Sequence, residues 1–203
     1  MDLPDAPVTL ALILANVGIS FYALFGDQDF LEQFKFDVNA LRQRGQHYRV
    51  FTSSFLHNDL FHLLFNMMAL FSFGPYLEQL LGRTGFLVIY FGAILISGIV
   101  TFFVNRQDGA YSSVGASDAV SGVVFGFILF YPLESLYIFP LPVPIPAILF
   151  GGLFIIGSSF LMDRQDRRIA HESHLAGAAA GLILTIAMQP AAFSVFIAKM
   201  TGT

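Results

Sequence analysis

The sequence predicts an all-α polytopic membrane protein, folded as a bundle of six transmembrane helices. Hydrophobic residues make up 56% of the 203 residues and charged residues only 12%, about half the charged fraction of a soluble domain. The mean hydropathy is +0.70. The length accommodates roughly six spans of about 20 residues with short loops. We therefore expect a single membrane domain over residues 1–203, with the lipid bilayer as its main solvent.

Charge and cysteine content exclude several kinds of function. The chain has no cysteine, which excludes disulfide bonds, thiol catalysis and thiolate metal sites. The net charge of −4 is small and spread out, and no basic run predicts a nucleic-acid partner. The first residues, Met1–Pro7, are acidic and lack the basic start of a signal peptide, so the first apolar run is expected to remain as a span.

The first predicted span covers residues 7–25, and residues 26–49 form a polar stretch after it. Apolar side chains recur in this stretch at helical spacing, at Phe30, Leu31, Phe34, Val38 and Leu41. Charged residues lie between them, so the pattern predicts an amphipathic helix at the membrane interface. A solvated loop with some apolar residues is the alternative.

Five further spans are predicted from the remaining apolar runs. They cover residues 60–81, 85–104, 117–131, 147–162 and 170–188. Gly82 and Arg83 close the second span, and Pro190 stops the sixth. The prolines within 140–146 mark a turn before the fifth span, because they cannot all lie inside a helix. The charged residues 163–168 link the fifth span to the sixth.

Six spans place both termini on the same side of the membrane. Eight of the ten Lys and Arg residues lie in the links after spans one, three and five: Lys35, Arg42, Arg44, Arg49, Arg106, Arg164, Arg167 and Arg168. The positive-inside rule would place these links in the cytoplasm. The family resemblance described below implies the opposite, so the sequence leaves the orientation open.

Polar and ionisable side chains inside apolar spans are costly, so each of them marks a candidate functional site. The first cluster is His57, His62 and Asn66, around the start of the second span. His62 and Asn66 are four residues apart and share one face of the helix. The alternative is that these side chains only form hydrogen bonds with neighbouring helices.

The second cluster is the sequence GASDAVSG, residues 115–122, which opens the fourth span. Ser117 lies in the first turn, where a serine is a natural helix cap. A helix start also directs free backbone N–H groups at one point, where they can stabilise an oxyanion. The motif is not the G-x-S-x-G elbow of soluble hydrolases, because residue 119 is alanine and no strand is expected before it.

The third cluster is His174 with the small residues that follow it in the sixth span. These small residues share a helix face with His174 and are Gly177, Ala178 and Gly181. The fourth span carries its own pair, Gly122 and Gly126. Helices that pack through small residues approach closely. Such packing would bring Ser117 and His174 within hydrogen-bond distance.

Together the three clusters predict a nucleophilic site. Ser117 and His174 both open even-numbered spans, so they lie at the same depth on the same side. A serine hydroxyl is a weak nucleophile until a base takes its proton, and His174 can do so. The candidate oxyanion donors are the Ser117 backbone N–H, His62 and Asn66. His171, one turn earlier, is a minor alternative base that lacks the small-residue stripe.

Together these residues resemble the motifs of a known family. The motifs H-x4-H-x3-N, G-x-S and a histidine followed by small residues resemble those of the rhomboid proteases. Tyr48 and Arg49, followed by FTSSFLH, are similar to that family's lead into its second span, although tryptophan is more usual at the tyrosine. Gly74, Glu78 and Gly82 fit the end of that helix. The resemblance covers nearly the whole chain.

The resemblance implies an intramembrane serine endopeptidase that cleaves single-span membrane proteins. It implies a Ser–His dyad without a required acid, no cofactor and no metal, and a site that opens to the non-cytoplasmic side. We expect residence in the bacterial inner membrane; the oligomeric state is left open. The implied site consists of the nucleophile Ser117, the base His174, the oxyanion residues His62, Asn66 and Ser117, and the supporting residue His57. We also expect Gly115 and Asp118, which flank Ser117 in the motif, to be supporting residues of the site.

Asp118 departs from the family pattern, which usually has glycine directly after the serine. A carboxylate at a helix start is favoured by the helix dipole. The same charge beside a developing oxyanion would oppose catalysis. The sequence therefore suggests that Asp118 lowers activity without abolishing the fold. The alternative is that Asp118 points to water and changes little.

Three other classes of function compete with this interpretation. The first is a catalytically inactive rhomboid-like protein that binds membrane clients. The second is a metalloprotease using His171, Glu172 and His174, although the zinc signature H-E-x-x-H fails here by one residue. The third is a transporter with the histidines as a proton path, but the symmetric broken helices of such proteins are not evident.

Overall fold

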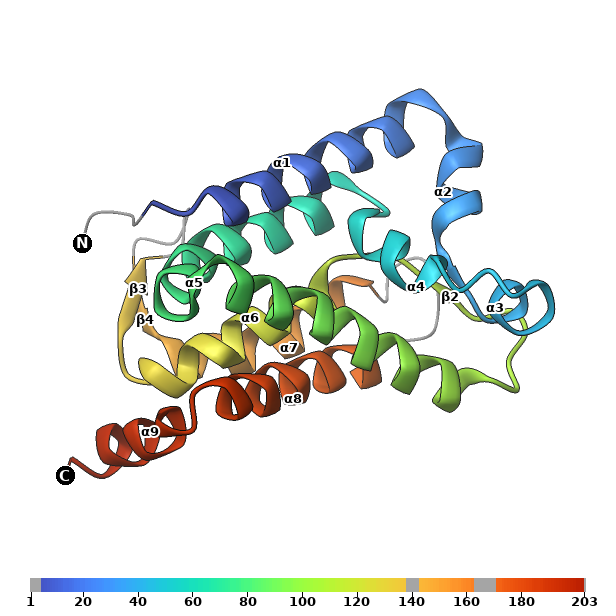
Figure 1. Ribbon diagram of the computed structural model, residues 1–203. Helices are drawn as coiled ribbons and strands as arrows, with labels where there is room; N and C mark the ends of the chain where they lie inside the picture. Colours follow the sequence, from blue (N-terminus) through green and yellow to red (C-terminus); the bar gives the residue numbers. More distant parts are fainter. Residues whose placement is uncertain (1–4, 138–142, 163–170, 203) are drawn as a thin grey trace.

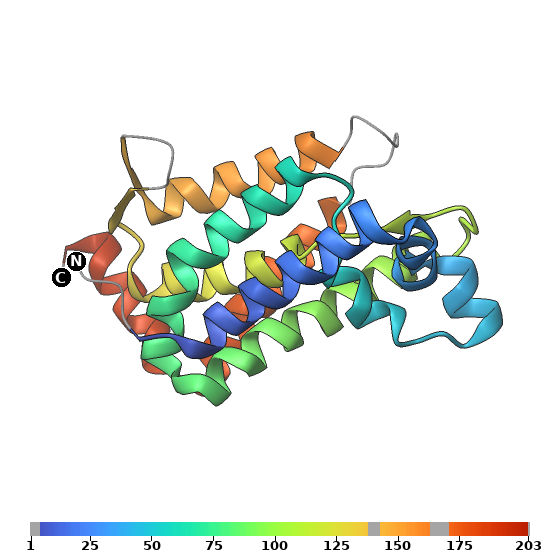
Figure 2. The same cartoon turned by 90° about the horizontal axis from the view of Figure 1, so that it is seen from above.

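A computed structural model describes residues 5–137, 143–162 and 171–202. Helices are found at all six predicted positions. The long helices are α1 (Pro7–Phe21), α5 (Leu60–Asn105), α6 (Ser117–Phe130), α7 (Ala147–Met162) and α8 (His171–Met188). Helix α6 is the central element: nearly all of its residues are buried, and it packs against α5, α7 and α8 (Figures 1 and 2).

Helix α5 is a helical hairpin rather than one rod. Its 46 residues would measure roughly 70 Å as a straight helix, about twice the thickness of a bilayer core. Gly82 interrupts it with φ 71° and ψ 168°, a positive-φ backbone that glycine adopts readily. The two halves run in opposite directions (Figure 1). The predicted boundary between spans two and three therefore coincides with a glycine break.

Within the part of the chain that the structure describes, two helical stretches are long and apolar enough on their own to cross a membrane, Pro7–Gly26 and Leu60–Asn105. The segments Glu172–Met188 and Ala191–Thr201 meet the same criterion only as a pair, bent by 111°. Helix α6 and the segment Ala147–Ile156 are apolar but shorter. Large hydrophobic side chains are exposed on several helices, including Leu10, Leu14, Phe71, Leu95, Leu153 and Ile183. Such an exterior suits lipid rather than water.

Helix α1 is polar on the side that faces the protein. Its buried residues are Thr9, Leu12, Asn16 and Ser20, whereas Leu10 and Leu14 are exposed. The Asn16 amide donates to the Tyr90 hydroxyl of α5 at 3.1 Å. In lipid, a helix gains little by burying apolar surface, so polar contacts and close packing attach it to its neighbours. A one-turn π-helix, Tyr22–Gly26, extends α1.

Glu78 fastens the start of α1 to α5. The Glu78 carboxylate is 3% exposed and accepts from the Val8 N–H (3.1 Å), the Thr9 N–H (2.8 Å) and the Thr9 hydroxyl (2.8 Å). The first N–H groups of a helix have no partner within the helix, so a carboxylate from a distant segment satisfies them here.

Replacing Glu78 with Ala is expected to lower the free energy of unfolding by about 2–3 kcal/mol, because three donors lose a charged acceptor. Thermal unfolding in detergent micelles measures the change. Glu32→Ala is the matched control, since the Glu32 carboxylate is 63% exposed and pairs with Lys35, and such surface pairs contribute about 0–1 kcal/mol. Equal midpoints for the two variants would show that Glu78 does not hold α1.

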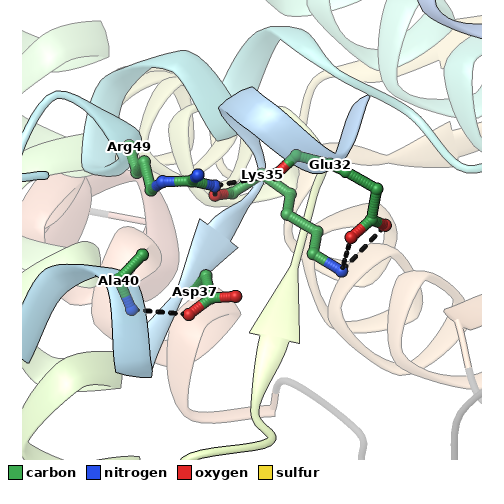
Figure 3. A network of polar contacts seen from close by, with 5 residues as sticks. All are labelled: Glu32, Lys35, Asp37, Ala40 and Arg49. Carbon is green, nitrogen blue, oxygen red and sulfur yellow. Dashed lines mark hydrogen bonds and ion pairs between the residues drawn. The ribbon is translucent and has the colours of Figure 1, made fainter. Parts of the chain in front are cut away.

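The prediction of one amphipathic helix after the first span is wrong, because the segment is divided into several shorter elements. The segment forms α2 (Gln28–Phe34), the short strand β1 (Phe36–Asp37) and α3 (Val38–Arg44). Lys35 is extended, with φ −62° and ψ 153°, and ends α2. The Asp37 side chain then accepts from the Ala40 N–H at 2.7 Å and caps α3 (Figure 3). Local capping thus overrides a continuous helical pattern.

Arg49, in the short helix α4 (Arg49–Thr52), explains where α2 ends. Its guanidinium is buried and donates to the carbonyls of Glu32 and Lys35, both at 2.9 Å (Figure 3). The last carbonyls of a helix have no partner within it, and Arg49 supplies one. The 3-10 turn Ser53–Phe55 follows α4 and leads towards α5.

Among the described residues, two small antiparallel sheets accompany the mostly helical bundle. Strand β1 pairs with β2 (Ser112–Ser113), and β3 (Ser135–Tyr137) pairs with β4 (Pro144–Pro146). Part of the predicted proline turn is thus an edge strand, a position that prolines tolerate because no N–H is needed. Residues 138–142 and the predicted charged link 163–168 lie outside the described residues.

An additional helix, α9 (Ala191–Thr201), was not predicted. Pro190 ends α8 but also stands at the N-cap of α9, because proline is tolerated at a helix start. The Lys199 ammonium lies 4.1 Å from the centre of the Tyr131 ring, which ties α9 to the end of α6.

Candidate active site

Two helix starts bring a serine and a histidine together. Ser117 is the first residue of α6, and His174 lies in the first turn of α8. The Ser117 Oγ atom is 2.6 Å from His174 Nε2, and the two side chains are 4% and 0% exposed. Ser117 does not cap its helix: the N-cap is Ala116, which makes no side-chain bond. The capping interpretation of Ser117 is therefore wrong.

Glycine contacts between α6 and α8 set the distance between these two residues. A Cβ atom on Gly177 would collide with the backbone carbonyl of Asp118. A Cβ on Gly181 would lie 2.5 Å from the Cα of Gly122. No side chain fits at either contact, so backbone meets backbone, as expected for helices that pack through small residues.

The loop that delivers Ser117 is anchored to the segment before α5. The Gly115 N–H donates to the Ser53 carbonyl at 3.0 Å, and the Ala116 N–H donates to His57 Nε2 at 3.4 Å. Gly115 has φ +130°, a backbone that residues with a side chain rarely adopt, and a Cβ there would also collide with the His62 ring. The loop conformation thus requires glycine at position 115.

His57 has a defined tautomer. Because its Nε2 accepts from Ala116, its Nδ1 carries the proton and donates to the Ser20 hydroxyl at 2.8 Å. Ser20 in turn donates to the Phe55 carbonyl at 3.0 Å. Burial, with a smaller contribution from the neighbouring His62, holds the pKa of His57 well below its usual range. A neutral His57 therefore supports the Ser117 loop.

His62 and Asn66 are buried beside this loop with unpaired polar atoms. Their exposures are 4% and 0%. Among the described residues, His62 Nε2 and both polar atoms of the Asn66 amide have no hydrogen-bond partner. Leaving a buried polar group unpaired costs about 1–3 kcal/mol. Buried polar atoms without a partner are rare in folded proteins and call for an explanation. A polar group of a bound molecule could form the missing hydrogen bonds.

Asp118 does not point to water. Its side chain is 7% exposed, and its Oδ2 accepts from the hydroxyls of Ser97 (3.1 Å) and Ser54 (3.2 Å). Its Oδ1 accepts from the Ala119 N–H at 2.7 Å. The solvent-facing alternative is therefore wrong. The carboxylate belongs to a small polar pocket that Ser117 and His174 also line.

Glu172, a member of the competing metal-site hypothesis, has other partners. Its Oε1 atom accepts from the Asn105 amide (2.8 Å) and the Tyr111 hydroxyl (3.1 Å). Burial and the negative charge of Glu172 raise the pKa of Tyr111. The contacts of Glu172 thus tie the start of α8 to the end of α5. The side chain of His171 lies outside the described residues.

Four serines around the pair were not predicted from the sequence. Ser20 forms a hydrogen bond with His57, Ser54 and Ser97 donate to Asp118, and Ser173 contacts Ser97. Ser20 carried a usable signal, because it continues the inward polar face of α1. Ser97 and Ser173 carried none, since single serines inside apolar helices are common and their partners lie far away in the chain.

These features define a class of protein. A helical bundle with an apolar exterior and a buried Ser–His pair at two helix starts describes an integral membrane protein with a buried polar site. A family model described as "Rhomboid domain" matches residues 44–191. The chain belongs to the rhomboid family and is an integral membrane protein.

Several relatives carry rhomboid names. The chain is 28% identical over 199 residues to "RHOMBOID-like protein 12, mitochondrial" of Arabidopsis thaliana, covering 89% of this chain and 58% of that protein. It is 43% identical over 89 residues to "Putative rhomboid protease YdcA" of Bacillus subtilis, covering 44% of this chain and 43% of that protein. It is 35% identical over 97 residues to "Rhomboid protease GluP" of the same organism, covering 48% of this chain and 18% of that protein. The chain thus spans less than two thirds of the length of each of these relatives.

Proposed function

We propose that this rhomboid-family chain is an intramembrane serine endopeptidase that cleaves single-span membrane proteins. The observation that carries the proposal is the buried 2.6 Å contact between Ser117 Oγ and His174 Nε2. In this role Ser117 is the nucleophile and His174 the general base. The names of the Bacillus relatives, which include "protease", support the same reaction class.

The proposed reaction proceeds through an acyl-enzyme. His174 Nε2 takes the hydroxyl proton as Ser117 Oγ attacks the carbonyl carbon of the scissile peptide. The oxyanion that forms accepts from the Ser117 backbone N–H, His62 and Asn66. His174 then protonates the leaving amine as the carbon–nitrogen bond breaks. A water molecule, activated by His174, hydrolyses the ester and restores the serine.

The polar pocket beside the pair supports the hydrolytic step. It is lined by Ser117 and His174 and has room for about one water molecule. The other polar side chains of its wall are Ser53, Ser54, Ser97, Thr101, Ser113, Asp118 and Ser173. Hydroxyl groups of this kind can hold a water molecule within an otherwise apolar bundle.

The proposal includes a membrane topology. Residues 1–203 would form one domain with six spans, in which α5 contributes two and the shorter α6 is surrounded by the others. A short central helix suits a site that water reaches from one side of the bilayer. Residence in a bacterial inner membrane stays a prediction, because relatives include both Bacillus and mitochondrial proteins.

The proposal is tested by reconstituting the purified protein in liposomes with a fluorescent single-span test substrate. We expect cleavage within the substrate's membrane segment, and covalent labelling by a fluorophosphonate probe that maps to Ser117. Cleavage that a chelator abolishes, without probe labelling, would favour the metalloprotease instead. A protein that binds the substrate but neither cleaves it nor reacts with the probe would be an inactive client-binding rhomboid.

Asn66→Leu is expected to separate activity from stability. If Asn66 donates to the oxyanion, kcat should fall by about 10²–10³-fold. The midpoint of thermal unfolding should stay level or rise, because the buried amide has no partner among the described residues and its removal relieves a desolvation cost. Retained kcat would exclude Asn66 from the oxyanion site.

A further inference from the structure

A buried carboxylate directly follows the proposed nucleophile, yet the two-residue mechanism gives it no role. Asp118 has no cationic partner among the described residues, and its three acceptor contacts come from neutral groups. Burying a charge in a bundle is costly unless its hydrogen bonds are satisfied. Here the hydroxyls of Ser54 and Ser97 and the Ala119 N–H donate to the Asp118 carboxylate. A buried carboxylate with its own set of donors points to a specific function.

The hydrogen bonds around Asp118 have one consistent direction. A carboxylate only accepts, so the Ser97 hydroxyl donates its proton to Oδ2. Ser97 Oγ also lies 3.0 Å from Ser173 Oγ. Because the Ser97 proton is already used, Ser173 is the donor in that contact. The chain of bonds runs from Ser173 through Ser97 to Asp118.

This chain of bonds, which we call the Asp118 clasp (Asp118, Ser97 and Ser173), joins the neighbours of both reacting residues. Asp118 follows Ser117 on α6, and Ser173 precedes His174 on α8. Ser97 belongs to the second half of α5, which stands between them as the common partner. The clasp therefore connects the first turns of α6 and α8 through side chains that do not react.

We propose that Asp118 is a positioning residue, and that the clasp holds α6 and α8 in the register that keeps Ser117 Oγ in contact with His174 Nε2. The proposal rests on the proposed protease function. Gly177 allows α8 to approach the Asp118 backbone but gives no directional contact. The clasp supplies direction, since each hydrogen bond fixes one helix start relative to α5. Asp118 thus supports the reaction rather than suppressing it.

The test compares Asp118→Asn, Asp118→Gly and Ser97→Ala in liposomes with the same single-span substrate. We expect Asp118→Gly and Ser97→Ala to lower kcat by about 10- to 100-fold with KM little changed, because a small misplacement of reacting groups slows chemistry. Asp118→Asn should retain most of the activity, since its amide oxygen can accept from Ala119 while its NH₂ group donates to the serines. Combining Asp118→Gly with Ser97→Ala should add little further loss, because both remove one clasp.

Ser72→Ala is the matched control, since the Ser72 hydroxyl bonds to the Met68 carbonyl of its own helix and the variant should match the parent. Asp118→Gly with unchanged or higher kcat would overturn the clasp and indicate that the carboxylate suppresses the site. Equal losses in Asp118→Asn and Asp118→Gly would overturn it too, because charge rather than hydrogen bonding would then matter. A parent that neither cleaves nor labels would instead refute the protease function on which the clasp rests.

Discussion

Ser117→Ala and His174→Ala are each expected to abolish cleavage of a single-span substrate, with losses of roughly four to six orders of magnitude in kcat. The physical reason is that the nucleophile and its base act as one unit. Without His174, the Ser117 proton has no acceptor at the observed 2.6 Å contact. Removing both residues should therefore cost little more than removing either one.

Probe labelling and substrate cleavage should be measured on the same preparations. Ser194→Ala is a suitable control, since Ser194 lies on α9, is exposed and bonds to the Ala191 carbonyl. Thermal unfolding of each variant shows whether lost activity reflects lost fold. Fluorophosphonate labelling of Ser117→Ala at the parental rate would mean that another residue is the nucleophile.

Gly181→Ala is expected to give the second largest effect. The added Cβ would lie 2.5 Å from the Cα of Gly122, so α6 and α8 must move apart. Displacing reacting groups by about 1 Å can slow a reaction by roughly 100-fold, and overpacking costs about 1–3 kcal/mol of stability. Both kcat and the midpoint of thermal unfolding should therefore fall.

The same substitution at an open position provides the comparison. Gly18 lies on the exposed side of α1, and a Cβ atom added there would meet no other atom within 4 Å. Gly18→Ala should leave kcat unchanged and stabilise α1 by up to about 1 kcal/mol, because alanine is the better helix former. A Gly181→Ala variant with parental kcat would show that the α6–α8 contact does not set the dyad geometry.

Much of the site could be predicted because membranes make polar residues conspicuous. Ser117, His174, His62 and Asn66 stand out against apolar neighbours, so hydropathy alone marks each of them as a candidate. The small-residue stripe of α8 likewise predicted close packing, and the structure shows Gly181 against Gly122. The environment of Asp118 could not be predicted, since Ser54 and Ser97 lie 64 and 21 residues away in the chain.

The errors have two physical origins, contacts with distant residues and local caps. The segment after the first span has a helical apolar pattern, but Arg49 satisfies the end of α2 and Asp37 starts α3. The Arg49 contact joins residues that meet only in the folded chain. The Asp37 contact is a local cap inside the apolar pattern. Pro190 follows the end of α8 and is also the N-cap of α9. Because proline was interpreted only as the end of a helix, α9 was not predicted.

The amino-acid sequence was sufficient to predict the lipid solvent, the apolar helices at the six predicted positions and the residue types of the candidate site, because hydropathy and helical period are local properties of the chain. The folded structure was needed to show that Ser117 Oγ and His174 Nε2, which are 57 residues apart in the chain, lie 2.6 Å from each other, and that Asp118 faces hydroxyls rather than water. Those outcomes depend on how α5, α6 and α8 pack, and packing is set by contacts between distant segments that no local pattern contains.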